Sequence, residues 1–227
     1  MYAFGIITQK AFSAICGRFS GALGLSGKEM TDITDYIQSY EECLKRYDPD
    51  FLELFKSGGA RDLVESKLNS LPLSLPSDLI ELYVWRDGLK GWKYFESFID
   101  GYTFLPLDEA IKSYDLNVEL QKRFDPKGII FGGGPWPGEK IYPKGIFTFM
   151  QCDGNYVGIA EAESNEESSE LVSVSRDGDI RVYFSSLSKL FEYLAKCHEE
   201  GILPDEDGEA WEKLEEFKKS IDPKPYA

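Results

Sequence analysis

Apolar residues recur at helical spacing through the first third of the chain. From Thr31 onward they fall at every third or fourth position, which predicts an amphipathic helix with an apolar face of Ile33, Tyr36, Ile37, Tyr40 and Leu44. Asp48-Pro49 begins a shorter predicted helix that runs through Phe55 and is closed by Gly58-Gly59. A third helix is predicted over 61–68, with its inward positions at Leu63, Val64 and Leu68.

The stretch from Leu75 to Gly88 has the clearest start and stop signals in the sequence. Pro76 breaks the preceding segment, and Ser77 can cap a helix by accepting from its first free N–H groups. The next apolar residues give this helix one apolar side: Leu79, Ile80, Leu82 and Tyr83. Gly88 is expected to end the helix, since glycine takes the left-handed conformation of a helix C-terminus at little cost.

The spacing of the apolar residues changes from helical to strand-like in the middle of the chain. Short aromatic runs at 92–95 and 101–104, and an apolar run at 129–131, predict strands, and a helix is expected within 107–124. The glycine- and proline-rich run over 132–138 predicts a loop.

Two hairpins are expected after this loop. Residues 145–150 and 156–160 flank Asp153-Gly154, and residues 171–175 and 180–184 flank Asp177-Gly178. An acidic linker separates the hairpins, and two helices follow. The first, over 186–198, has its inward positions at Leu187, Leu190, Phe191 and Leu194; the second, over 209–221, has them at Trp211, Leu214, Phe217 and Ile221.

Helices, then hairpins, then helices predict an α+β fold with a single, mainly antiparallel sheet flanked by helices. The expected organisation is an N-terminal extension over 1–29, a domain over 30–200 with a helical N-terminal part, and an acidic helical C-terminal extension over 201–227. Residues 1–28 contain three basic residues and no acidic one. They are interpreted as an overcalled start upstream of the functional initiator Met30 or as a plain extension, or alternatively as a targeting peptide, because such peptides are basic and acid-poor.

The charge balance disfavours nucleic acid and favours a basic protein as the partner. Forty Asp and Glu against 25 Lys and Arg give a formal net charge of −15, which repels nucleic-acid backbones and suits a basic protein partner. The four cysteines are widely spaced, which favours reduced thiols and a cytoplasmic protein. Polar residues interrupt every apolar run before it reaches the length of a membrane span. The sequence does not predict an oligomeric state.

The candidate catalytic patterns in the sequence lack the residues or the geometry that their chemistry requires. The glycine loop lacks the Lys-Ser/Thr pair of a phosphate-binding loop, because Gly138 is followed by Glu139. Cys197 and His198 are helix neighbours that do not face each other, so we interpret them as a partly buried cysteine beside a surface histidine. One histidine cannot build a His-based metal site. We therefore predict no catalytic residues, no metal and no cofactor.

Partner binding is the expected use of the polar surface. Trp136 stands between two prolines in the predicted loop, and tryptophan is enriched at binding hot spots. Trp85 and Trp92 are instead expected in the core. The acidic linker contains Glu163, Glu166 and Glu167. Two interpretations stay open for this linker: a solvated face that aids solubility, or a complementary surface that captures a basic partner.

The order of several motifs resembles the SUKH superfamily, also called the Smi/Knr-like domain. The Leu-Pro and apolar helix over 75–88, the element Phe104-Leu105-Pro106-Leu107-Asp108-Glu109, the hairpin Asp153-Gly154-Asn155-Tyr156 and the helix over 186–194 appear in the order of that family. The resemblance covers about residues 60–198. The chain departs from the family in having Arg86-Asp87-Gly88 in place of Asn-Gly and in its flanking helical extensions.

This resemblance implies a non-catalytic protein-binding domain. Bacterial relatives commonly serve as immunity proteins that neutralise toxins, many of them nucleases, and yeast relatives regulate the cell wall through protein contacts. A basic toxin is the partner that this resemblance and the acidic charge together indicate. The alternative from another class is a carboxylate-based hydrolase acting on polysaccharide or cell wall, which requires two acids in one aromatic-lined cleft.

Overall fold

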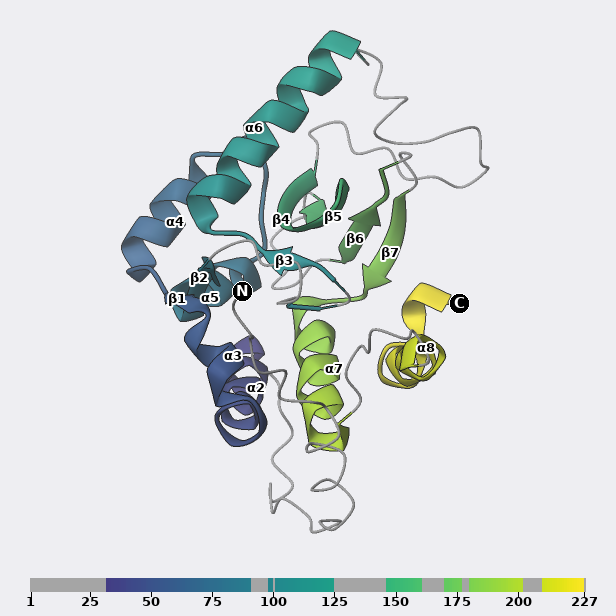
Figure 1. The fold of residues 1–227 in the computed structure, drawn as a ribbon. Helices are drawn as coiled ribbons and strands as arrows, with labels where there is room; N and C mark the ends of the chain where they lie inside the picture. Colours follow the sequence, from purple (N-terminus) through teal and green to yellow (C-terminus); the bar gives the residue numbers. More distant parts are fainter. Residues whose placement is uncertain are drawn as a thin grey trace, which may run out of the picture.

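The computed structural model describes residues 32–90, 98–99, 101–124, 146–160, 170–176, 180–201 and 210–226 (Figure 1). The first half of the chain contains α2 (Ile33–Tyr47), α3 (Pro49–Glu53), β1 (Phe55–Ser57), α4 (Arg61–Asn69), α5 (Ser77–Trp85), β2 (Arg86–Leu89), β3 (Thr103–Phe104) and α6 (Leu107–Phe124). The second half contains β4 (Ile146–Cys152), β5 (Asn155–Ala160), β6 (Leu171–Val174), β7 (Ile180–Phe184), α7 (Leu187–Glu200), α8 (Ala210–Ile221) and the 3-10 turn η1 (Lys224–Tyr226).

Side-chain caps fix the starts of the first two helices. Asp32 Oδ1 accepts a hydrogen bond from Thr34 N at 3.0 Å, and this bond lowers the pKa of Asp32. Asp48 caps α3 in the same way through Phe51 N at 3.1 Å, with Pro49 in the first turn. The predicted apolar face of α2 is confirmed at its four buried positions, Ile33, Ile37, Tyr40 and Leu44, while Tyr36 is half-buried.

Two predictions in the helical third are wrong in detail. Phe55 does not continue the second helix but begins β1, which pairs antiparallel with β2 in a separate two-stranded sheet. Leu63 does not face inward: 54% of it is exposed, whereas Val64 and Leu68 are buried. Helix α4 rests mainly on α5, so the side of α4 that contains Leu63 faces solvent.

The helix predicted from Ser77 is confirmed, but its ends differ from those expected. Pro76 occupies the N-cap position in an extended conformation, so Ser77 is the first helical residue. The helix ends at Trp85, and Gly88 lies within β2. Gly88 has φ +76°, and a Cβ there would lie 2.3 Å from Pro106 N. Glycine at this position therefore allows β2 to pass against the 105–106 backbone, which precedes α6.

The main sheet is antiparallel with strand order β3-β4-β5-β6-β7. Both predicted hairpins are confirmed by the pairing of β4 with β5 and of β6 with β7. The sheet is curled, because the rings of Tyr102 beside β3 and Tyr183 in β7 lie 5.9 Å apart although they belong to opposite edges. The strands expected at 92–95 and 129–131 and the glycine loop lie outside the described residues.

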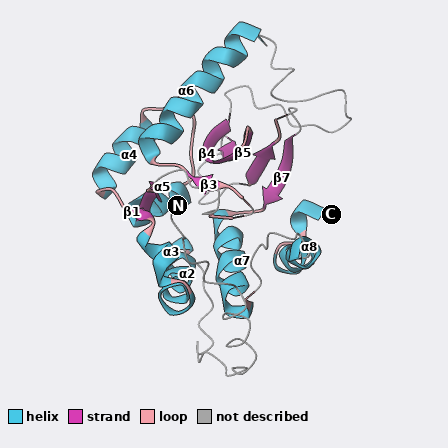
Figure 2. Cartoon of the chain, viewed as in Figure 1, coloured by secondary structure: helices cyan, strands magenta, loops and turns pink. Residues whose placement is uncertain are grey.

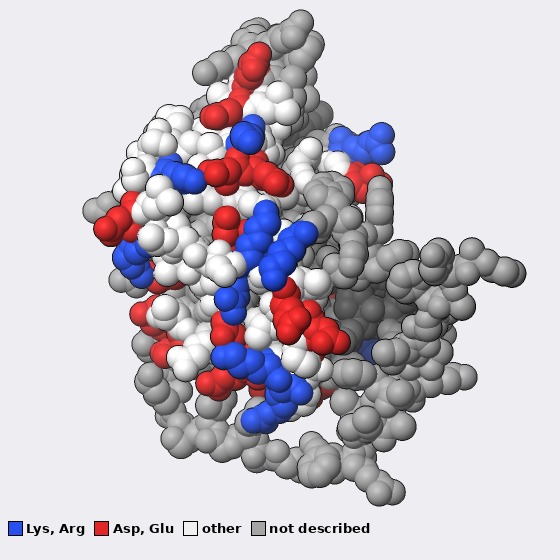
Figure 3. Space-filling view, turned by 60° about the vertical axis from the view of Figure 1, so that its left-hand side comes forward, with Lys and Arg blue, Asp and Glu red and all other residues white. Residues whose placement is uncertain are grey.

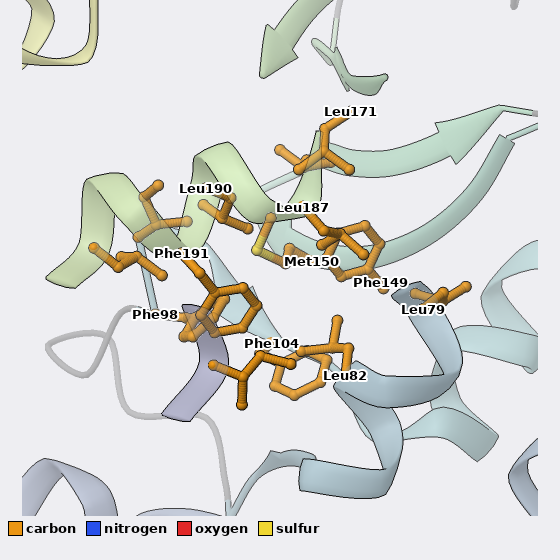
Figure 4. Packing of buried hydrophobic residues seen from close by; sticks show 14 of the residues in the cluster. Leu79, Leu82, Phe98, Phe104, Phe149, Met150, Leu171, Leu187, Leu190 and Phe191 are labelled. Carbon is orange, nitrogen blue, oxygen red and sulfur yellow. The ribbon is translucent and has the colours of Figure 1, made fainter. Parts of the chain in front are cut away.

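Helix α7 lies at the centre of the packing. It lies between α2 and α8 and below the main sheet (Figure 2), and it contacts α2, α8 and β7. Its buried positions include Tyr193, Ala195 and Cys197 in addition to the four predicted inward residues. Figure 4 shows how side chains from three parts of the chain meet in one core: Leu79 and Leu82 from α5, Phe104, Phe149 and Met150 from the sheet, and Leu187, Leu190 and Phe191 from α7. Burial of this apolar surface is the main stabilising contribution to the fold.

The fold class is thus α+β, with an antiparallel sheet flanked by helices, as predicted. The core includes the helical N-terminal part of the predicted domain and continues into the predicted C-terminal extension: Ile37 and Tyr40 of α2 and Leu214 and Ile221 of α8 belong to the same buried cluster. The side chain of Trp211 and residues 1–31 lie outside the described part of the chain. The boundaries at 29 and 200 stay predictions.

Candidate partner-binding surface

The four residues predicted to contact a partner, Trp136, Glu163, Glu166 and Glu167, lie outside the described residues. The described residues that flank them are close together. Ile146, which follows the segment with Trp136, pairs with Ala160, which precedes the acidic linker. Leu171, which follows this linker, pairs with Ile159. Both predicted binding segments are therefore attached at the same end of the main sheet.

Helix α6 presents a polar face on the surface next to this end of the sheet. Its buried side faces β4, where the rings of Tyr114 and Phe147 lie 6.4 Å apart and the hydroxyls of Ser113 and Thr148 are within 3.2 Å. The exposed side over the first three turns consists of Asp108, Glu109, Lys112, Asp115, Leu116 and Glu119. Four of these six side chains are acidic, and they lie on a helix held in place by the core.

The start of α6 is positioned by the stretch from Leu75 to Gly88, here called the signature segment, whose helix α5 is the signature helix. Asp87 Oδ1 accepts a hydrogen bond from Leu107 N at 2.7 Å and so caps the helix from 20 residues away. Tyr83 supports the same turn, because its buried hydroxyl donates to Leu105 O at 3.3 Å. Asp87 was not singled out from the sequence, although an Asp-Gly before a Leu-Pro helix start is a signal that could have found it. The signature segment thus orients the exposed face of α6.

Charges on the surface around α4 and α6 are mixed. Arg61 Nη2 lies 2.6 Å and 2.7 Å from the two carboxylate oxygens of Glu81, and Lys67 Nζ lies 2.5 Å from Asp108 Oδ1. Figure 3 shows basic and acidic side chains interspersed over the described part of this side of the molecule. Exposed ion pairs contribute little to stability, about 0–1 kcal/mol each. Such charges are better suited to selecting a partner than to holding the fold together.

Trp85, expected in the core from the sequence, is partly buried and packs against the core. Its ring packs against Tyr40, Phe55 and Phe191, and its Nε1 donates to Glu41 Oε2 at 2.5 Å. Burial raises the pKa of Glu41, but the hydrogen bonds from Lys45 and Trp85 and the charge of Arg86 more than offset this effect. The pKa of Glu41 therefore lies below its ordinary value, and its carboxylate ties α2 to the end of α5.

Cys197 and His198 differ from the predicted arrangement. Cys197 is buried rather than partly buried, and His198 is half-buried, with its ring 5.7 Å from that of Tyr40. Burial lowers the pKa of His198, and the charge of Asp48 opposes this only in part. Across α2 and α7, Cys43 Sγ lies 3.6 Å from Glu199 Oε1, and burial together with this carboxylate raises the pKa of Cys43 to about 12. Cys43 is thus a protonated, unreactive thiol at neutral pH.

Within the described part of the chain, no helix is long and apolar enough to cross a membrane. No cluster of three or more His, Cys, Asp or Glu side chains with metal-binding geometry occurs among the residues that the structure places. The acids of the linker at 161–169 and those at 205–207 lie outside those residues.

A family model for the SMI1 / KNR4 family (SUKH-1) matches residues 61–193. The match covers more than half of the chain, and it includes the signature helix, Asp87, α6, the whole main sheet and the first half of α7. The chain belongs to the SMI1/KNR4 family (SUKH-1). This SUKH-1 chain extends the matched region with α2 on one side and α8 on the other. No curated protein matches it.

Proposed function

We propose that this SUKH-1 chain is a non-catalytic, cytoplasmic protein-binding domain that acts as an immunity factor by neutralising a basic toxin. Family membership carries the proposal, because the resemblance implies binding of proteins rather than catalysis. The net charge of −15 supports it, since opposite charge speeds the encounter with a basic partner and rejects acidic ones.

The contact surface proposed here combines the exposed face of α6 with the two segments attached at the adjacent end of the sheet. On α6, the acids Glu109, Asp115 and Glu119 are exposed. Because the opposite side of α6 packs on β4, the backbone of this face is already ordered before binding. Trp136, Glu163, Glu166 and Glu167 are proposed as the anchor and the charged rim of the same interface.

The test uses the product of the gene adjacent to this one as the probe. The full chain is expected to bind that protein, and the triple variant Glu109→Gln/Asp115→Asn/Glu119→Gln is expected to associate about tenfold more slowly at low salt. The matched control Glu200→Gln/Glu212→Gln/Glu216→Gln removes the same charge from exposed positions on α7 and α8 and is expected to bind like the unmodified chain.

Equal losses in both triple variants would place the interface elsewhere and leave only the general charge effect. Recovery of no protein partner, together with turnover of a polysaccharide substrate, would replace the proposal with the hydrolase alternative.

A further inference from the structure

Strand β7 forms one edge of the main sheet, next to β6. An edge strand has backbone N–H and C=O groups that point away from the sheet and can pair with another strand. Its sequence, Ile180-Arg181-Val182-Tyr183-Phe184, is rich in β-branched and aromatic residues, which suit strand pairing. The C-terminal segment formed by α8 and η1 (210–226) packs beside the C-terminal end of this strand (Figure 1).

Lys218 of α8 marks the position of the C-terminal segment. Its Nζ lies 3.5 Å from the ring centroid of Tyr183 and 4.6 Å from that of Phe184, and only 5% of the residue is exposed. Consecutive residues of a strand project to opposite faces, so an ammonium near both rings lies beside the strand rather than on one face. The two rings compensate part of the cost of burying this charge.

Two more polar contacts hold the C-terminal segment against β6 and β7. Asp222, 2% exposed and one turn after Lys218, accepts a hydrogen bond at 2.5 Å from the backbone N of Ser185, the first residue after β7. Lys224 Nζ lies 3.0 Å from Glu170 Oε1, directly before β6. Apolar contacts add to these, since Leu214 and Ile221 are buried and the ring of Phe217 lies 6.2 Å from that of Tyr193.

We propose that the C-terminal segment is an intramolecular cover over a strand-pairing surface, and that a second copy of this chain occupies the surface when the cover is released. The β7 edge is self-complementary. In an antiparallel, two-fold pairing centred on Val182, each Arg181 lies opposite Tyr183 of the other copy. The guanidinium of Arg181 then lies against the ring of Tyr183, which the Lys218 ammonium contacts in the covered state.

The test compares two double variants of the full chain. Lys218→Met/Asp222→Ala removes two of the polar contacts, and Lys213→Met/Glu216→Ala makes the same kinds of change at exposed positions on α8. In the first variant, hydrogen exchange at β7 and Ser185 is expected to rise about tenfold or more, and sedimentation is expected to show a concentration-dependent dimer. The control is expected to match the unmodified chain in both measurements.

Adding Arg181→Ala to the first variant is expected to weaken the dimer, because it removes the contact with Tyr183. Unchanged exchange in the first variant would contradict the cover, and faster exchange without a dimer would contradict pairing with a second copy. A dimer of equal strength in the unmodified chain would also overturn the proposal. If the first double variant does not fold, Lys224→Ala takes its place, because it removes only the exposed ion pair with Glu170. Its effect is measured by the same hydrogen exchange and sedimentation experiments.

Discussion

At the scale of single residues, the sequence predicts contacts between near neighbours in the chain, such as helix caps. It does not predict contacts between residues that are far apart in sequence. The caps formed by Asp32 and Asp48 follow from residue type and position. His198 looked like a surface residue because it stands near the end of an amphipathic helix. It is instead packed against Tyr40, a contact between α7 and α2 that no local pattern reveals.

His198 gives a prediction for stability against pH. Since burial lowers its pKa in the folded protein, the unfolded chain binds a proton more readily below the ordinary value of 6.5. Stability is therefore expected to be unaffected above that pH and to fall as the pH drops toward the folded-state pKa, by at most about 1.4 kcal/mol per pH unit. Urea unfolding between about pH 7.5 and pH 5.5 measures this loss.

The control for this measurement is His198→Gln, which removes the only histidine of the chain. Its stability is expected to change less over the same pH range than that of the unmodified protein. Parallel pH profiles of the two proteins would show that His198 does not titrate with an altered pKa.

At the scale of elements, the longer helices and both hairpins were predictable, because period and turn residues define them. The sheet of β1 and β2 was not, since strands of three and four residues are too short to show alternation. The face of α4 was assigned wrongly at Leu63, because spacing alone does not say how many neighbours a helix has. Of the candidate surface, the polar face of α6 follows from its sequence, whereas the cap from Asp87 depends on a contact between two elements.

Gly88 offers the sharpest test at this scale. An alanine there meets both an unfavourable positive φ and the backbone of Leu105 and Pro106, so Gly88→Ala is expected to lower the free energy of unfolding by about 3 kcal/mol or more. Gly101 has φ +85°, but the nearest atom to an added Cβ is Cys152 Sγ at 3.4 Å. Gly101→Ala is therefore expected to lose only about 1–2 kcal/mol. Chemical denaturation compares the two, and equal losses would mean that β2 can shift away from the 105–106 backbone.

At the scale of the whole molecule, the family match and the core do not have the same extent. The match begins at residue 61, yet Ile33, Ile37, Tyr40 and Leu44 of α2 are as deeply buried as the matched core residues. Helix α7 joins the two parts, because it packs against α2, α8 and β7 together. We therefore expect residues from α2 to α7 to unfold as one cooperative unit.

Ile37→Ala tests this expectation from outside the family match. It is expected to lower the stability of the entire molecule by about 2–5 kcal/mol, as for a large-to-small change in a core. Far-UV circular dichroism and tryptophan fluorescence are expected to report the same transition. The exposed neighbour Gln38 supplies the control, since Gln38→Ala is expected to change stability by no more than about 0.5 kcal/mol. Two separate transitions, or a small effect of Ile37→Ala, would make α2 an independent appendage.

The pairing of α2 with α7 also determines when the core can close during synthesis. The contact between Cys43 and Glu199 joins residues 156 positions apart, so α2 leaves the ribosome long before its partner helix exists. At about 5–20 residues per second, the apolar side of α2 waits roughly 8–30 s for α7. During that interval its aromatic and aliphatic side chains are available to chaperones, and Tyr40 reaches its buried position only after most of the chain has been translated.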